Sequence, residues 1–138
     1  GNEGADQLYG GVGNDTLAGG PGSDTLNGAI GLDAFVFNSN PGATNVDLVQ
    51  DFSVADDTVW LENAVFTVLV STGTLGAGLL RAGAGITTAA DGNDFILYNS
   101  STGALFYDAD GSGTGAAPVQ FALLGTGLAL TVADFVVV

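Results

Sequence analysis

Large apolar residues recur every nine positions in the N-terminal part of the chain, at Leu8, Leu17, Leu26 and Phe35. Each of them is the middle residue of a three-residue segment that can form a short strand with its centre pointing inward. The six residues between such segments are too rich in glycine to hold a helix or a strand. This pattern predicts short strands that alternate with tight turns.

Glycine and aspartate follow the same period. Written in nines, the units are GNEGADQLY, GGVGNDTLA, GGPGSDTLN and GAIGLDAFV, with glycine at the first and fourth positions and aspartate at the sixth. A flexible Gly/Asp-rich linker is the alternative, but a linker has no reason to keep its apolar residues at a strict period. The pattern therefore indicates a true repeat of the nonapeptide kind that binds calcium. Carbonyl oxygens and one carboxylate per turn are the hard ligands that calcium prefers, and two turns must stack to complete its shell.

These units resemble the RTX family, the hemolysin-type calcium-binding repeats of secreted bacterial proteins. The resemblance implies an all-β fold, a parallel β-roll of calcium-binding nonapeptides followed by a β-rich C-terminal cap. Two nonapeptides would make one coil, so that turns two units apart in the sequence share an ion. We expect the roll at residues 1–37 and the cap at residues 38–138.

The resemblance also implies the ligands. The earlier turn of each pair gives the carbonyls of its second and fourth residues, the later turn gives those of its first and third, and both give their aspartate. The first implied site consists of Asn2, Gly4 and Asp6 with Gly19, Pro21 and Asp24, beside the turn glycines Gly20 and Gly22. The second consists of Gly11, Gly13 and Asp15 with Gly28, Ile30 and Asp33. Because Asn2 and Ala29 replace the usual second glycine, we expect the first and last turns to be less ideal.

Strand-like runs continue after the repeats, at residues 47–52 and 57–61, with a turn between them. This arrangement resembles the segment that follows the repeats in serralysin-like proteins, where it continues the roll and closes its open end. Asp51 lies two repeat lengths beyond Asp33, and we expect Asp51 and Asp57 to complete a further calcium site with the last turns. The alternative is that these aspartates cap strands and turns in water. Residues 63–70 could form a short helix or a strand, and their β-branched side chains favour the strand.

A hairpin is predicted over residues 94–108, and it runs directly into Asp108, Ala109, Asp110 and Gly111. Carboxylates at alternate positions followed by glycine are typical of a tight loop that wraps calcium, so Asp108 and Asp110 are candidate ligands. The loop is not an EF-hand, because it lacks that motif's last glutamate. An acidic turn without an ion is the alternative.

Composition narrows the possible partners. Fifteen acidic residues against the single base Arg81 give a net charge of −14, which argues against nucleic acid and anionic membrane surfaces as partners. We expect Arg81 to pair with one of the many carboxylates. The apolar fraction of 46% is too high for a disordered chain. No stretch qualifies as a membrane span, because the most apolar run, residues 121–133, is too short and contains glycines.

The chain lacks the residues that several kinds of catalysis require. The chain has no cysteine, histidine or lysine, and it contains neither an H-E-x-x-H nor a G-x-S-x-G motif. We therefore expect no enzymatic activity from this domain. Because the chain begins in phase with a repeat, we expect it to be the C-terminal part of a longer protein, present as a monomeric module.

The resemblance implies calcium as the cofactor, the type I secretion machinery as a partner, and an extracellular bacterial location. Residues 130–138 place one acid before four apolar residues and resemble a type I secretion signal. The expected function is thus a non-catalytic module that folds on extracellular calcium and supports secretion of a larger protein. The alternative is calcium-dependent binding to polysaccharide or a cell surface, for which Tyr9, Trp60, Tyr98 and Tyr107 are the candidate aromatics, although core positions suit them better.

Overall fold

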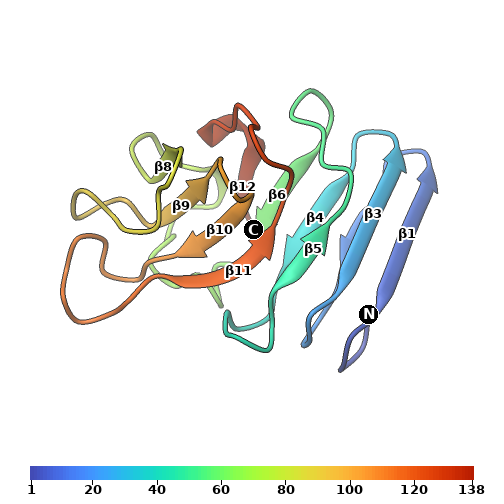
Figure 1. The fold of residues 1–138 in the computed structure, drawn as a ribbon. Coiled ribbons are helices and arrows are strands. Elements are labelled where there is room, and N and C mark those ends of the chain that lie inside the picture. The colour runs from blue at the N-terminus through green and yellow to red at the C-terminus, as the bar shows by residue number, and fades with distance from the viewer.

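Two β-sheets enclose a shared hydrophobic core in the computed structural model, which describes residues 1–138 (Figure 1). The seven-stranded sheet has the order β1-β3-β5-β11-β10-β9-β8, and the five-stranded sheet has the order β2-β4-β6-β12-β7. One 3₁₀ turn, η1 (Val132–Asp134), is the helical part of the chain. No helix has the length and apolar character needed to cross a membrane. The predicted all-β fold is confirmed.

The nonapeptides contribute strands to the two sheets in alternation. β1 (Gln7–Val12) and β3 (Thr25–Ile30) belong to the larger sheet, and β2 (Thr16–Ala18) and β4 (Ala34–Phe37) to the smaller one. β1 pairs in parallel with β3, and β2 pairs in parallel with β4. Leu8 stands opposite Leu26, and Leu17 opposite Phe35, so equivalent residues of alternate units are stacked as in a β-roll.

Burial follows from this stacking. Leu17, Leu26 and Phe35 are buried in the core, whereas Leu8 is only partly buried because β1 is the outermost strand of its sheet. The apolar residue of each unit therefore points inward, and on β1, β2 and β3 its strand neighbours are more exposed than it is.

A third coil continues both sheets past the repeats. β5 (Asp47–Val49) pairs in parallel with β3, and β6 (Thr58–Leu61) pairs in parallel with β4. Val49 stands opposite Leu26 and Val59 opposite Phe35, so the third coil contains more residues than the two-unit coils before it. In the half of the coil that leads to β5, the additional residues form the loop at residues 38–46 between β4 and β5.

The C-terminal part is joined to this third coil through both sheets. β11 (Val119–Leu123) pairs in parallel with β5, and β12 (Phe135–Val137) pairs in parallel with β6. β9 (Ile96–Asn99) and β10 (Ala104–Tyr107) form an antiparallel hairpin beside β11. The sheets end at β8 (Leu80–Gly83) and β7 (Gly73–Thr74). In Figure 1 the roll lies on the right, with β1 outermost, and the cap on the left.

Two expectations for single segments are wrong. Residues 63–70 form turns rather than a strand, with the N–H groups of Val65 and Phe66 both donating to the Glu62 carbonyl. The turn carries Phe66 and Leu69 into the core, which a flat strand at this position would not do. Arg81 donates to the Thr88 carbonyl instead of pairing with a carboxylate, because it lies on β8 beside that loop.

Candidate metal centre

Aspartates of successive coils are stacked along the edge of the roll where β1, β3 and β5 begin. The N–H of Asp6 donates to Oδ1 of Asp24 at 2.7 Å, and the N–H of Asp24 donates to Oδ1 of Asp47 at 3.0 Å. Asp47 was not among the predicted ligands. The signal that could have identified it is its place at the start of a strand-like run, after a loop that breaks the period of nine.

A second column follows the opposite edge, where β2, β4 and β6 begin. The N–H of Asp15 donates to Oδ1 of Asp33 at 2.8 Å, and the N–H of Asp33 donates to Oδ1 of Asp57 at 3.0 Å. The second oxygen of Asp57 accepts the N–H of Ser53 at 2.8 Å. The structure thus places Asp57, which the sequence predicted as a ligand, directly in register with the repeat aspartates.

Three of these carboxylates each keep one oxygen without a partner. The Oδ2 atoms of Asp15, Asp24 and Asp33 are shielded from solvent and accept no hydrogen bond. An unpaired buried carboxylate oxygen is costly, and a bound cation is one way to satisfy it. The residues at these turns therefore fit a calcium ion.

The first glycine of each unit keeps the space beside these oxygens free. A Cβ at Gly10 would lie 2.8 Å from Oδ2 of Asp15 and 2.8 Å from the carbonyl oxygen of Gly28. Gly19 and Gly28 stand in the same relation to Oδ2 of the aspartate that follows each of them in its own turn. Any side chain at these positions would occupy the site, which explains why the repeat requires glycine there.

The backbone groups of the implied sites also come together. The carbonyl of Gly4 packs against Gly22, a Cβ at Gly20 would lie 3.0 Å from the Asn2 carbonyl oxygen, and the Gly19 carbonyl packs against Gly1. Turns two units apart in the sequence therefore contribute carbonyl oxygens to one place.

Two predicted carbonyl ligands also take part in the hydrogen bonds between coils. The Pro21 carbonyl accepts the N–H of Gly4 at 2.8 Å, and the Ile30 carbonyl accepts the N–H of Gly13 at 2.9 Å. Each keeps a second lone pair for an ion. Gly11 stands opposite Ala29 in the β1–β3 ladder, at the same level as this second pair of turns.

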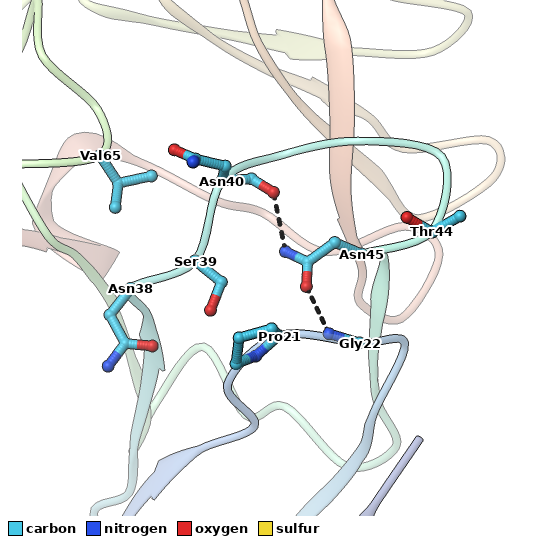
Figure 2. Close-up of a pocket in the computed structure, with 8 residues that line it drawn as sticks. All are labelled: Pro21, Gly22, Asn38, Ser39, Asn40, Thr44, Asn45 and Val65. Atoms are coloured by element: carbon cyan, nitrogen blue, oxygen red, sulfur yellow. Dashed lines mark hydrogen bonds between the residues drawn. The ribbon is translucent and has the colours of Figure 1, made fainter. Parts of the chain in front are cut away.

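In the third coil, side-chain oxygens rather than glycine turns contact the turns of the coil before it. Figure 2 shows Asn45 between two of its partners: its Oδ1 accepts the N–H of Gly22 at 2.7 Å, and its Nδ2 donates to the Asn40 carbonyl at 3.0 Å. At the other edge, the two oxygens of Asp51 accept the N–H groups of Gly28 at 3.0 Å and Ala29 at 2.8 Å. Asp51 lies outside the aspartate columns and contacts the start of the fourth turn, and its expected role as a ligand stays a prediction.

Burial raises the pKa of the aspartates at the ends of the columns. Desolvation raises the pKa of Asp47 to about 6, and the charge of Asp24 adds to this effect while the Asp24 N–H opposes it. Desolvation also raises the pKa of Asp57, against the hydrogen bonds from Ser53 and Asp33. In the absence of a cation, these columns therefore resist full ionisation.

Asp108 and Asp110 lie in a separate acidic loop. Oδ2 of Asp110 accepts the N–H groups of Gly115 at 2.7 Å and Ala116 at 3.0 Å, and these bonds lower the pKa of Asp110. Its Oδ1 is shielded and without a partner, and burial raises the pKa of the neighbouring Asp108. No group of three or more carboxylates converges in the chain, so carboxylates alone do not make up a calcium shell here. A calcium ion at Asp108 and Asp110 stays a prediction.

The candidate aromatics occupy different environments. Tyr98 and Tyr107 are buried in the core, and Trp60 is half-buried with its Nε1 donating to Oγ1 of Thr58 at 3.0 Å. Tyr9 is 75% exposed on β1.

The stacked glycine turns and their aspartate columns define a calcium-binding β-roll. Residues 1–34 match the RTX calcium-binding nonapeptide repeat in four copies. The chain therefore carries RTX repeats, a calcium-binding and non-catalytic type of repeat, and its cofactor is Ca²⁺. No curated protein matches the chain.

Proposed function

We propose that this domain is a non-catalytic module that folds on extracellular calcium and supports the type I secretion of a larger bacterial protein. The observation that carries the proposal is the set of buried, partnerless Oδ2 atoms of Asp15, Asp24 and Asp33. Stacking the coils brings these charges together without a counter-charge, so the folded roll needs a cation. Calcium is the cation that the RTX repeat binds.

The free energy that calcium binding adds to the folded state is large enough for the domain to fold outside the cell and not in the cytosol. At the affinities of about 10⁻⁴ M typical of extracellular modules, millimolar calcium stabilises the folded state by roughly 1.4 kcal/mol per site. Two sites then contribute about 3 kcal/mol, a large part of the stability of a small domain. In the cytosol calcium is far scarcer and this contribution vanishes. The chain stays loose inside the cell and folds outside it.

The C-terminal segment supports the same order of events. Residues 130–138 resemble a secretion signal, but in the fold Leu130, Phe135 and Val137 are buried and β12 lies between β6 and β7. An exporter can contact these side chains only before the domain folds. The absence of cysteine also suits export without disulfide formation.

A calcium titration followed by far-UV circular dichroism tests the proposal. At neutral pH we expect a disordered spectrum in excess chelator and a β spectrum in millimolar calcium, with magnesium at the same concentration as the control cation. Magnesium prefers a rigid octahedral shell and should not replace calcium. A β spectrum that is unchanged by excess chelator would rule out calcium-driven folding.

A further inference from the structure

The outer face of the β1–β3–β5 sheet carries an exposed aromatic residue among polar side chains. Leu8, Leu26 and Val49 point into the core, so their neighbours on each strand point outward. Tyr9 stands opposite Asn27, and Gln7 stands opposite Thr25. Gln50, which directly follows β5, extends the row of Tyr9 and Asn27 on the third strand.

These outward side chains line a shallow hollow of about 470 Å³, within the size range of small-ligand sites. The chain carries fifteen acidic residues and one basic residue, yet none of them lines this hollow. The lining is therefore uncharged, with polar side chains beside the ring of Tyr9 and the partly buried Leu8. A charged ligand would find no opposite charge here.

The hydrogen-bonding groups of the hollow are mostly free. Nδ2 of Asn27 donates to Oε1 of Gln50 at 3.4 Å, a long contact, and Gln7 and Thr25 make no side-chain hydrogen bond within the protein. An amide presents donors and an acceptor side by side, and so complements a hydroxyl group, which both donates and accepts. The ring of Tyr9 is 75% exposed, so it contributes little to the core and leaves an apolar face open to a ligand.

We propose that this face, formed by Tyr9, Gln7, Asn27, Thr25 and Gln50, binds a neutral saccharide. The apolar C–H face of a sugar ring packs on Tyr9, and its hydroxyl groups exchange hydrogen bonds with the amides. A polyanionic glycan is disfavoured by the net charge of −14. The site depends on the pairing of β1 with β3, so the inference rests on the proposed folding in calcium.

Isothermal titration calorimetry in millimolar calcium tests this inference, with maltohexaose and cellohexaose as neutral probes and oligogalacturonate as the anionic probe. We expect the folded domain to bind at least one neutral hexasaccharide more tightly than the anionic one. Tyr9→Ala should weaken that binding roughly tenfold through loss of the stacking surface, while Tyr9→Phe, which keeps the ring, should retain it. Val70→Ala, at an exposed position far from this face in the sequence, is the matched control and should leave binding unchanged.

Circular dichroism of every variant separates this inference from the proposed function. A domain that is folded in calcium but binds neither neutral probe overturns the saccharide site and leaves calcium-driven folding intact. Equal or tighter binding of oligogalacturonate overturns the neutral specificity. Equal loss of binding in Tyr9→Ala and Val70→Ala would place the ligand elsewhere. A domain that needs no calcium to fold contradicts the proposed function alone, and the saccharide titration still reports on Tyr9.

Discussion

At the second position of the turns, the backbone conformation of one residue depends on hydrogen bonds to a distant side chain. Gly11 and Gly20 occupy it with φ of 110° and 90°, and Ala29 occupies it with φ of 71°. Ala29 is the one non-glycine residue with a positive φ, a conformation that costs an L-residue about 1–2 kcal/mol. The carboxylate of Asp51, which accepts the N–H groups of Gly28 and Ala29, holds this strained turn in place.

Replacing Ala29 by glycine should therefore stabilise the domain. Relief of the left-handed strain exceeds the entropy that glycine adds to the unfolded chain, so we expect a gain of about 0.5–1 kcal/mol in the free energy of unfolding. Urea unfolding in calcium measures it. Ala43→Gly, in an exposed loop where φ is not positive, is the control and should not stabilise. No gain in Ala29→Gly would show that the turn is relaxed.

The two pairs of turns should differ in calcium affinity. Turns two and four present two partnerless oxygens, Oδ2 of Asp15 and of Asp33. Turns one and three present only that of Asp24, because Oδ2 of Asp6 accepts the N–H of Asn2 at 2.9 Å. The Asn2 N–H competes with an ion for Oδ2 of Asp6, so we expect turns two and four to form the tighter site.

Asp33→Asn tests this difference. The substitution keeps an oxygen for the Asp15 N–H but removes the charge, and we expect the tighter site to lose at least about tenfold in affinity. Calcium titration calorimetry measures it. Asp56→Asn, whose carboxylate is exposed and bonded to Ser53, is the control. An unchanged tight site in Asp33→Asn would contradict the assignment.

At the scale of elements, the roll is closed at one end and open at the other. β5 and β6 are covered by β11 and β12, which extend both sheets in parallel. At the opposite end β1 and β2 are edge strands, and each has a strand neighbour on only one side. The C-terminal residues therefore protect the third coil from pairing with other chains.

Two substitutions in β12 test whether its buried side chain anchors the cap to the roll. Phe135 is fully buried in the core, whereas its neighbour Val136 is only partly buried. Phe135→Ala should cost about 3–5 kcal/mol of stability, and Val136→Ala less than about 1.5 kcal/mol. Urea unfolding in calcium distinguishes them. Similar costs for both would indicate that β12 does not anchor the cap.

At the scale of the molecule, calcium and protons compete for the same excess of negative charge. The net charge is −14, and burial raises the pKa of Asp47 to about 6 from an ordinary 3.8. A carboxyl group whose pKa is raised by folding binds a proton more tightly in the folded state. Its ionisation therefore removes stability as the pH rises through this window.

Without calcium, the domain should thus lose stability between pH 3.8 and about 6. With saturating calcium the ions neutralise the columns, and this loss should disappear. Thermal unfolding across this range, with and without calcium, tests the difference. Asp47→Asn keeps an acceptor for the Asp24 N–H and should flatten the calcium-free profile. A calcium-free stability that rises over this window would contradict the assignment.

The sequence alone determined the repeat, because a strict period of nine sets a constant spacing between equivalent residues. The resemblance to RTX repeats implied that units two apart would stack, and in the structure Leu8 meets Leu26 and Asp15 meets Asp33. Local requirements also decided the glycines, because only glycine leaves space beside the aspartate oxygen.

Only the tertiary structure decided which residues continue the two columns of aspartates in the third coil. After the loop at residues 38–46 the spacing is no longer constant, and Asp57 rather than Asp51 stacks below Asp33. The register of β5 and β6 follows from which apolar residues face the core, and a core is a property of the whole chain. The tertiary structure also decided which aromatic side chains are exposed. Tyr98 and Tyr107 are buried in the core, whereas Tyr9 lies on the surface.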